Sequence, residues 1–500
     1  MRPYIIGVDI GTGSAKAVSI DFFGEILASS QVHYPMLKNP EGFSEQDPET
    51  VWDAFVKCVK EIVNTMQHVP VAVSLSSCMH SLIVTDKNHF PITNLISWAD
   101  TRSEKIAYEI RESENAESIY KETGTPIHSM SPLCKIIWLR TQATEIFAKA
   151  NKFISIKEFI WYKLFNAYQV DQSIASATGL FNIEKYEWNS NSLQLCGIET
   201  GHLSEIVRTD FIRNDANDKI ASLLHVSANT QFCIGASDGC LANLGSFAMD
   251  KATAAITIGT SGAVRIANAK PVINFGAMIF NYVLDTNTFI CGGPVNNGGN
   301  VFDWMMKSFL QIPNAGKREY DNFFKRVDEI PPGSKGLLFL PYLHGERAPI
   351  WDEKSCGLFF GIKSFHDQSY FLRAALEGIC YGLKNILQII EQATQAIKQL
   401  NVSGGFIHSE TWVQILADVT GKKICLVQTE DASAIGAGFL YLKAIKIVED
   451  YSSLKPSKKA TIEPGENNNL AHEKYFQVFK DLYLNLQESM HRIDDITTPG

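Results

Sequence analysis

The stretch Asp9-Ile10-Gly11-Thr12-Gly13-Ser14 returns about half a chain length later as Thr257-Ile258-Gly259-Thr260-Ser261-Gly262. Apolar runs of β type flank each copy, at 4–8 and 15–20 for the first and at 254–256 and 263–266 for the second, which predicts two β-hairpin tips. Glycine allows close approach of a ligand, and exposed N–H and hydroxyl groups donate to phosphate oxygens. The repeat predicts two related domains that hold one polyphosphate between their hairpin tips.

Composition narrows the class of protein. The chain has 500 residues, of which 45% are hydrophobic and 20% charged, as expected of a globular protein with two or three domains. The formal charge of −9 provides no electrostatic footprint for nucleic acid, so no nucleic-acid partner is expected.

The sequence also predicts a cytoplasmic protein without a membrane partner. No basic and apolar leader opens the chain, and no run of 18 apolar residues occurs. The ten cysteines are scattered singly, without a C-x-x-C pair, and histidines do not cluster at metal-ligand spacing. We therefore expect reduced, buried cysteines.

Strand and helix patterns alternate in both halves, which predicts an α/β architecture with mixed sheets. Asp47-Pro48-Glu49 predicts a helix start, and a small-residue helix is expected over 432–445. A hinge near Ser246 divides the chain into domains at 1–245 and 246–500. The tail after about residue 446 is polar, with helical periodicity only over 475–486, and receives no chemical role.

The first glycine loop is neither a Walker A motif nor a complete G-x-G-x-x-G fingerprint, and a plain hairpin turn explains it equally well. Asp9 stands just before it, where a carboxylate can ligate a phosphate-bound Mg²⁺ directly or through water.

Two functional interpretations fit Gly235-Ala236-Ser237-Asp238-Gly239. As G-x-S-x-G, it matches the nucleophile elbow of a serine hydrolase with Ser237 as nucleophile. As a strand end at an interdomain cleft, it offers Asp238 as a general base. The hydrolase interpretation leaves the duplicated loops unexplained, so we favour the base.

The chain resembles the FGGY carbohydrate kinases, members of the actin/hexokinase superfamily with two ribonuclease-H-like domains around an interdomain cleft. Residues 130–142 fit the first family signature, and residues 357–362 with 371–377 fit the second except at Tyr370, where a polar residue is usual. The resemblance covers about residues 4–446. It implies a sugar-binding N-terminal domain and a nucleotide-binding C-terminal domain.

The resemblance also implies site residues. Asp238 would be the catalytic base, and Asp9 and Asp238 would place Mg²⁺. ATP would be bound by two sets of residues, one in each half: Gly11, Thr12, Gly13, Ser14 and Lys16, and then Gly259, Thr260, Gly299, Asp303, Gly405 and Ser409. Lys16 stands where relatives often have Arg, which keeps the charge but loses the planar fork.

The sugar is predicted from two segments, Ser77-Cys78-Met79-His80-Ser81-Leu82 and Ser97-Trp98-Ala99-Asp100-Thr101-Arg102. Both are similar to the gluconokinase branch of the family, whereas xylulokinases read near Gln-Met-His-Gly and Trp-Asn-Asp-x-Arg. His80 and Arg102 are expected to meet the carboxylate of a sugar acid, and Asp100 to accept from its hydroxyls. Met79 is included among the substrate residues.

The resulting hypothesis is ATP-dependent phosphorylation of D-gluconate to 6-phospho-D-gluconate, with Asp238 as general base. A xylulokinase or another FGGY sugar kinase is the nearest alternative. A serine hydrolase and a non-catalytic ATP-binding module are the others. The sequence does not determine the oligomeric state, and a homodimer is one assembly it allows.

Overall fold

The computed structural model describes residues 2–39, 41–312, 317–427, 431–454 and 460–497. The chain forms two compact units, each assembled from three segments. Unit 1 comprises Met1–Met249, Ala267–Cys291 and Asp431–Lys455, and unit 2 comprises Asp250–Ile266, Gly292–Glu430 and Pro456–Gly500. The predicted division at residue 245 gives two continuous domains, whereas each of these units is discontinuous along the chain. That division therefore stays a prediction.

Unit 1 is built on a six-stranded mixed sheet with the order β14-β15-β6-β1-β2-β3. β1 is antiparallel to β2 and parallel to β6, and β15 is also parallel to β6. The strands are β1 (Tyr4–Ile10), β2 (Ser14–Asp21), β3 (Ile26–His33), β6 (Ala72–Ser77), β14 (Ile212–Arg213) and β15 (Gln231–Ser237).

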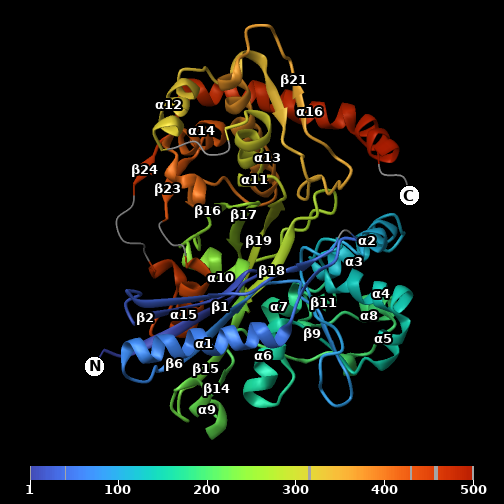
Figure 1. Cartoon of the computed structure of the whole chain (residues 1–500), viewed down its shortest axis with the longest axis vertical. Helices are drawn as coiled ribbons and strands as arrows, with labels where there is room; N and C mark the ends of the chain where they lie inside the picture. Colours follow the sequence, from blue (N-terminus) through green and yellow to red (C-terminus); the bar gives the residue numbers. More distant parts are fainter. Residues whose placement is uncertain (1, 40, 313–316, 428–430, 455–459, 498–500) are drawn as a thin grey trace. The chain divides into compact units, whose positions relative to one another are not determined.

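Residues on β1 alternate between two hydrophobic cores, one on each face of the sheet. Ile6 and Val8 pack in the core that contains α1 (Pro48–Met66) and α6 (Ile156–Phe165), whereas Ile5 packs with α10 (Asp238–Gly245) and α15 (Ala432–Ala444). Figure 1 shows α1 and α15 beside these strands. On β1, a Cβ at Gly7 would stand 1.9 Å from the carbonyl oxygen of Ala434, so glycine is what lets the small-residue helix α15 lie against the sheet.

The rest of unit 1 consists of short elements around this sheet. Its helices are α2 (Glu104–Arg111), α3 (Ala116–Thr123), α4 (Pro132–Gln142), α5 (Thr144–Lys149), α7 (Gln172–Ser176), α8 (Ser190–Cys196) and α9 (Asp218–Leu224). Its small strands are β4 (Leu37–Lys38), β5 (Ser44–Gln46), β7 (Ile83–Thr85), β8 (Leu95–Ile96), β9 (Lys152–Ile154), β10 (Gln169–Asp171), β11 (Phe181–Asn182), β12 (Glu187–Trp188) and β13 (Glu205–Val207). A longer strand, β18 (Phe280–Asp285), belongs to the seven-stranded sheet.

Unit 2 repeats the strand order of unit 1. The order β19-β17-β16-β22-β23 matches β3-β2-β1-β6-β15, with an antiparallel hairpin followed by parallel strands. β18 and β24 are the two edge strands of this seven-stranded sheet. The strands are β16 (Thr253–Ile258), β17 (Gly262–Asn268), β19 (Thr288–Val295), which begins in unit 1, β22 (Gln399–Ser403), β23 (Lys423–Leu426) and β24 (Thr461–Ile462). The predicted duplication and the predicted mixed-sheet α/β fold are confirmed.

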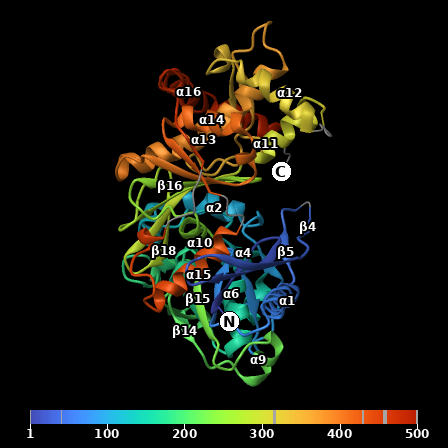
Figure 2. The same cartoon turned by 90° about the vertical axis from the view of Figure 1, so that its left-hand side faces the viewer.

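Helices of unit 2 pack on this sheet and on one another, as Figure 2 shows for α13, α14 and α16. They are α11 (Gly299–Trp304), α12 (Lys317–Asp328), α13 (Gln368–Ala393), α14 (Glu410–Thr420) and α16 (Glu466–Thr497), together with a small hairpin of β20 (Leu338–Leu340) and β21 (Leu358–Phe360). The predicted helix over 475–486 is the middle of the 32-residue α16, which begins and ends outside the periodic stretch.

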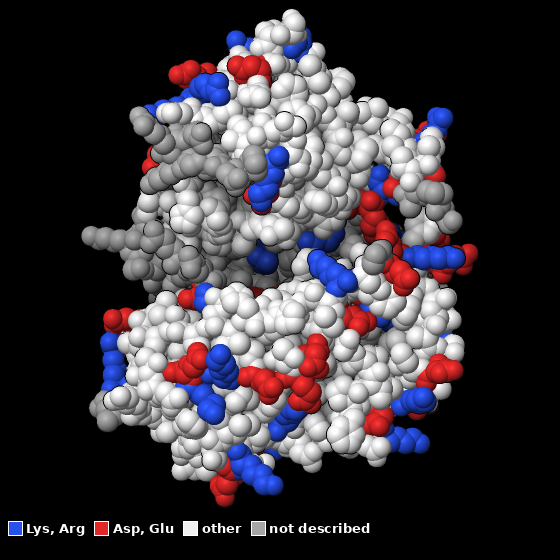
Figure 3. Space-filling model, in the orientation of Figure 1, with Lys and Arg blue, Asp and Glu red and all other residues white. Residues whose placement is uncertain are grey.

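Two further observations concern the surface charge and the hydrophobicity of the helices. Acidic and basic side chains are intermixed on the face drawn in Figure 3. Across the described ranges, none of the helices combines the length and the apolar character that a membrane span requires.

Candidate active site

The first glycine loop connects β1 to β2 in unit 1 and is held by side chains from other elements. The backbone N–H of Gly11 donates to Ser14 (3.0 Å), and the hydroxyl of Tyr34 donates to the carbonyl of Gly11 (2.5 Å). Trp98 Nε1 donates to the hydroxyl of Thr12 (2.9 Å). A Cβ at Gly13 would meet nothing within 4 Å, so open space adjoins the loop. The predicted phosphate loop therefore contacts one of the two predicted sugar segments.

Asp9 precedes this loop and pairs with Lys16 across the ladder. Ser76 donates to Asp9 Oδ1 (2.7 Å), and Lys16 forms an ion pair with Asp431 at the start of α15. Burial raises the pKa of Asp9, whereas the Ser76 hydroxyl and the Lys16 ammonium act against that rise. Asp9 Oδ2 lies on the side of Gly11, 3.7 Å from where a Cβ of that glycine would stand.

Asp238 begins α10, where the helix N-terminus favours a carboxylate. Its Oδ1 accepts from the N–H of Gly239 (2.7 Å), and its side chain is partly exposed. Burial, followed by the charges of Asp238 and Asp9, raises the pKa of the buried Cys78 thiol. The charges of both predicted carboxylates thus act on one thiol, although the two residues are far apart in the sequence.

The geometry of Ser237 does not favour the hydrolase interpretation. Its side chain is completely buried, and its hydroxyl accepts a hydrogen bond from Ser173 (2.9 Å). A nucleophile has to reach its substrate and needs an activating base. Ser237 instead contributes to the packing of the strand end.

Asp100 and Arg102, two predicted substrate residues, bind each other. Arg102 Nε and Nη2 donate to the two oxygens of Asp100 (2.8 and 2.7 Å), and Glu45 also pairs with the guanidinium. Asp100 is 0% exposed and accepts from the N–H of Ser44 (2.7 Å). The Arg102 guanidinium also lies 3.7 Å from the ring centroid of Phe43. Direct contact of either residue with a sugar stays a prediction.

Both ring nitrogens of His80 have partners inside the protein. Nδ1 faces the carbonyl of Ala177 at 2.7 Å and must therefore carry the proton, since a carbonyl only accepts. Nε2 then accepts from the hydroxyl of Tyr282 (3.2 Å). Met79, beside it in sequence, is partly buried against the same hydrophobic core as Tyr282. A positive charge on His80 toward a carboxylate stays a prediction, and it would require exchange of the Tyr282 bond.

Lys135 joins the two predicted sugar segments, a role that sequence reasoning missed. Its ammonium is 0% exposed and donates to the carbonyls of His80 (2.6 Å) and Ser97 (2.7 Å). Burial lowers its pKa to about 7. The sequence signal was a single lysine within the apolar run Pro132-Leu133-Cys134-Lys135-Ile136-Ile137, inside the first family signature.

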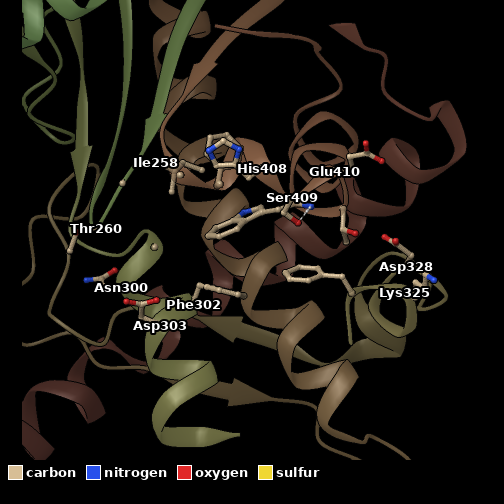
Figure 4. A pocket seen from close by; sticks show the side chains of 17 residues that line it. Ile258, Thr260, Asn300, Phe302, Asp303, Lys325, Asp328, His408, Ser409 and Glu410 are labelled. Carbon is tan, nitrogen blue, oxygen red and sulfur yellow. Dashed lines mark hydrogen bonds between the residues drawn. The ribbon is translucent and has the colours of Figure 1, made fainter. Parts of the chain in front are cut away.

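Unit 2 contains a pocket of about 980 Å³ between the second hairpin tip, α11 and α14. Figure 4 shows Thr260, Asn300 and Asp303 along one side of it, with Ser409 and His408 across from them. All six residues predicted to bind the nucleotide in this half line the pocket, namely Gly259, Thr260, Gly299, Asp303, Gly405 and Ser409.

The walls of this pocket combine apolar surface with polar groups, as small-molecule sites do. Phe302 and Phe406 flank Trp412, with ring centroids 5.6 and 5.7 Å from it. Ser409 caps α14 by accepting from the N–H of Trp412 (3.3 Å), and Asp303 pairs with Lys307 (3.1 Å). A planar base can bind to such aromatic walls.

The hairpin tip is fixed by direct backbone contact with the turn before α11. Gly299 N–H donates to the carbonyl of Gly259 (2.7 Å), and a Cβ at Gly299 would stand 2.6 Å from that oxygen. Glycine is therefore required at 299 for packing, while a Cβ at Gly259 or at Gly405 would meet nothing within 4 Å. The latter two leave space beside the pocket.

The residues fit a phosphate-bound Mg²⁺, although no group of three His, Cys, Asp or Glu side chains gathers as a metal site within the described parts of the chain. Mg²⁺ on nucleotides keeps several waters and takes only one or two protein carboxylates. The oxygens of Asp9 are of the required type and lie beside the glycine loop.

Comparison with known proteins identifies the family. The model of the FGGY family of carbohydrate kinases, N-terminal domain, matches residues 4–245, and its C-terminal domain model matches residues 254–444. A gluconokinase of Bacillus licheniformis is 38% identical over 98% of this chain and 96% of its own length. A xylulose kinase of Staphylococcus xylosus is 27% identical over 96% of this chain and 99% of its own length.

Solved structures agree with this assignment. The gluconate kinase of Lactobacillus acidophilus aligns with a TM-score of 0.93 at 31% identity, covering 99% of this chain and 100% of that one. A xylulose kinase of the same organism gives the same TM-score and identity over 98% of this chain and 100% of that one. The chain belongs to the FGGY family of carbohydrate kinases.

Proposed function

We propose that this kinase phosphorylates D-gluconate at its 6-hydroxyl, using ATP, and releases 6-phospho-D-gluconate and ADP. One observation carries the choice of sugar: identity is 38% to a curated gluconokinase but 27% to a curated xylulose kinase, both over nearly the whole chain. The reaction type follows from the family.

The proposed step is an in-line displacement at the γ-phosphorus. The 6-hydroxyl oxygen forms a bond to phosphorus as the bond from phosphorus to the bridging oxygen of ADP breaks, and Asp238 accepts the hydroxyl proton. Asp238 suits this role because it is partly exposed at the N-terminus of α10. The loop of Gly11, Thr12, Gly13 and Ser14 with Lys16, and the tip of Gly259 and Thr260, would donate to phosphate oxygens.

Mg²⁺, with Asp9 and Asp238 as the proposed protein carboxylates, would neutralise charge on the transferred phosphoryl group. The pocket in unit 2 is proposed to bind the adenosine, with Phe302 and Trp412 as apolar walls and Ser409 at its polar edge. We further propose a cytoplasmic homodimer, in which the ten free cysteines stay reduced.

A xylulose kinase is the second candidate, because a solved xylulose kinase matches the fold as closely as the solved gluconate kinase does. The catalytic residues would be the same, and only the sugar contacts would differ. Met79, His80, Asp100 and Arg102 are proposed as the region that decides between the two sugars.

The test of the reaction is direct identification of its products. Purified protein with ATP, Mg²⁺ and D-gluconate should yield a phosphate-monoester signal of a primary alcohol in ³¹P NMR, together with stoichiometric ADP. Asp238→Asn should lower kcat by about a hundredfold or more with the KM for ATP little changed. Formation of ADP without a sugar phosphate, or wild-type turnover by the variant, would refute the proposal.

A further inference from the structure

A β-bulge interrupts β15 shortly before Asp238, and the strand pairs with β6 again at Ala236 and Ser237. The pairing of β15 with β6 shifts register between Cys233 and Ala236, and Gly235 has a φ of 69°. A Cβ at Gly235 would stand 1.7 Å from the carbonyl oxygen of Leu75, so the bend is possible only with glycine. Because the regular pairing of β15 with β6 is broken three residues before α10 begins, this pairing alone does not set the direction in which α10 starts.

A buried lysine binds the strand at this bend. Lys157 on α6 is 1% exposed, and its ammonium donates to the carbonyl of Ala236 (2.7 Å) and to Asp171 Oδ2 (2.8 Å). Asp171 is 0% exposed and also accepts the N–H of Ile174 (2.9 Å), which caps α7. The carbonyl of Ala236 thus accepts a hydrogen bond from the lysine of a buried ion pair.

The other end of the same peptide group is also bound, because the Ala236 carbonyl and the Ser237 N–H belong to one peptide bond. The N–H of Ser237 donates to the hydroxyl of Ser173 (3.1 Å), and that hydroxyl donates to Ser237 Oγ (2.9 Å). Ser173 lies on α7, two residues after Asp171. Figure 1 shows α6, α7 and β15 in the same part of unit 1. Side chains of Lys157 and Ser173 therefore fix both ends of the Ala236–Ser237 peptide group, one residue before Asp238.

We propose that Lys157, Asp171 and Ser173 are positioning residues, which set the direction of the Asp238 carboxylate for proton transfer. The proposal rests on the proposed function, in which Asp238 is the base. Misplacement of a reacting group by about 1 Å can lower a rate by about a hundredfold. Removing one partner of a buried ion pair leaves the other charge unpaired, so a single substitution of Lys157 or Asp171 would also destabilise the fold.

The experiment neutralises the pair without stranding a charge. Lys157→Met combined with Asp171→Asn keeps side-chain volume and an oxygen that can cap α7. Kinetics with D-gluconate and ATP should show kcat lowered on the order of tenfold to a hundredfold, with both KM values within about twofold. Ser173→Ala, which alters no charge, should lower kcat in the same way but less.

The matched control is another buried ion pair, Arg373 with Glu377 on α13 in unit 2, joined at 2.9 Å. Arg373→Met with Glu377→Gln is expected to lower the melting temperature and leave kcat near wild type. A comparable loss of kcat in this control would overturn the positioning role, because it would show that any buried pair has that effect.

A double-mutant cycle with Asp238→Asn gives the sharpest readout. If the trio acts through Asp238, neutralising Lys157 and Asp171 should lower kcat by less than about twofold when Asp238→Asn is already present. Equal losses with and without Asp238→Asn, or wild-type kcat in the neutralised and Ser173→Ala variants, would overturn the proposal. Asp238→Asn with full activity would instead overturn the proposed function, so the two failures are distinguishable.

Discussion

Asp9 and Lys16 lie directly opposite each other in the β1–β2 ladder, at the base of the first glycine loop. On its other side Asp9 pairs with Ser76, whose hydroxyl donates to Asp9 Oδ1. A carboxylate between a hydroxyl donor and a cation stays ionised more easily than burial alone would permit. This arrangement favours an ionised Asp9 beside the phosphates that the glycine loop is proposed to bind.

Ser76→Ala should shift the pH dependence of the reaction. The hydroxyl lowers the pKa of Asp9, so its removal raises that pKa, and the ionised form is lost at a higher pH as the solution is acidified. The acid limb of the kcat/KM profile should move to higher pH, with the plateau at high pH nearly unchanged.

Ser74→Ala is the matched control, because Ser74 lies on the same strand, is equally buried and donates to Ala437 (2.6 Å) rather than to Asp9. Its acid limb should stay at the wild-type pH. Identical profiles for Ser76→Ala and wild type would contradict the electrostatic role assigned to Ser76.

Gly405→Ala should weaken nucleotide binding without unfolding the protein. The added methyl would meet no protein atom within 4 Å but would project beside the pocket that Gly405 lines. The KM for ATP should rise about tenfold, with the KM for the sugar unchanged, as steady-state kinetics can measure.

Gly382→Ala on α13 is the matched control, because its added methyl group also meets no protein atom within 4 Å. It should stabilise the helix by up to about 1 kcal/mol and leave the kinetics unchanged. An unchanged KM for ATP in Gly405→Ala would argue against the pocket as the adenosine site.

Lys135→Met should impair use of the sugar. It removes the ammonium that joins the carbonyls of His80 and Ser97, so the two predicted sugar segments would lose their common anchor. The KM for the sugar should rise by about tenfold or more while the KM for ATP changes little, since each buried carbonyl left unsatisfied costs about 1–3 kcal/mol. Lys105→Met, at an exposed position on α2, is the control and should behave as wild type. Equal changes in the two KM values of Lys135→Met would contradict a local role.

His472 should make the fold sensitive to acid. It is 0% exposed, and burial lowers its pKa from about 6.5 to about 3, so the unfolded chain binds a proton that the folded chain does not. The free energy of unfolding should therefore fall as the pH drops below 6.5, by up to about 1.4 kcal/mol per pH unit from this residue. Denaturant titrations from about pH 7 to about pH 5 should show a smaller fall in the free energy of unfolding for His472→Gln than for wild type. Equal falls in the two proteins would contradict this role of His472.

Local patterns predicted most of the scaffold. Asp47 caps α1 as expected, because a capping side chain and its helix are adjacent in the sequence. The two glycine hairpins were also predictable, since each is closed within one short segment. Family motifs then led to six residues that line the pocket of unit 2.

Long-range pairing accounts for what the sequence did not predict. Lys135 reaches His80 and Ser97, Lys157 reaches Ala236, and a lysine is ordinarily expected at the surface. The partners of His80 lie 97 and 202 positions away, so neither its tautomer nor its bond to Tyr282 can be read from local motifs. Arg102 was expected to face a ligand, yet Asp100 two residues before it and Glu45 on β5 bind its guanidinium.

The choice of sugar is the central claim, and competing substrates test it most directly. Initial rates of ADP release should be measured over a range of D-gluconate and of D-xylulose at saturating ATP and Mg²⁺. We predict a kcat/KM for D-gluconate at least about a hundredfold above that for D-xylulose, a difference of roughly 2.7 kcal/mol in transition-state binding. Equal values, or a higher value for D-xylulose, would contradict the proposed function.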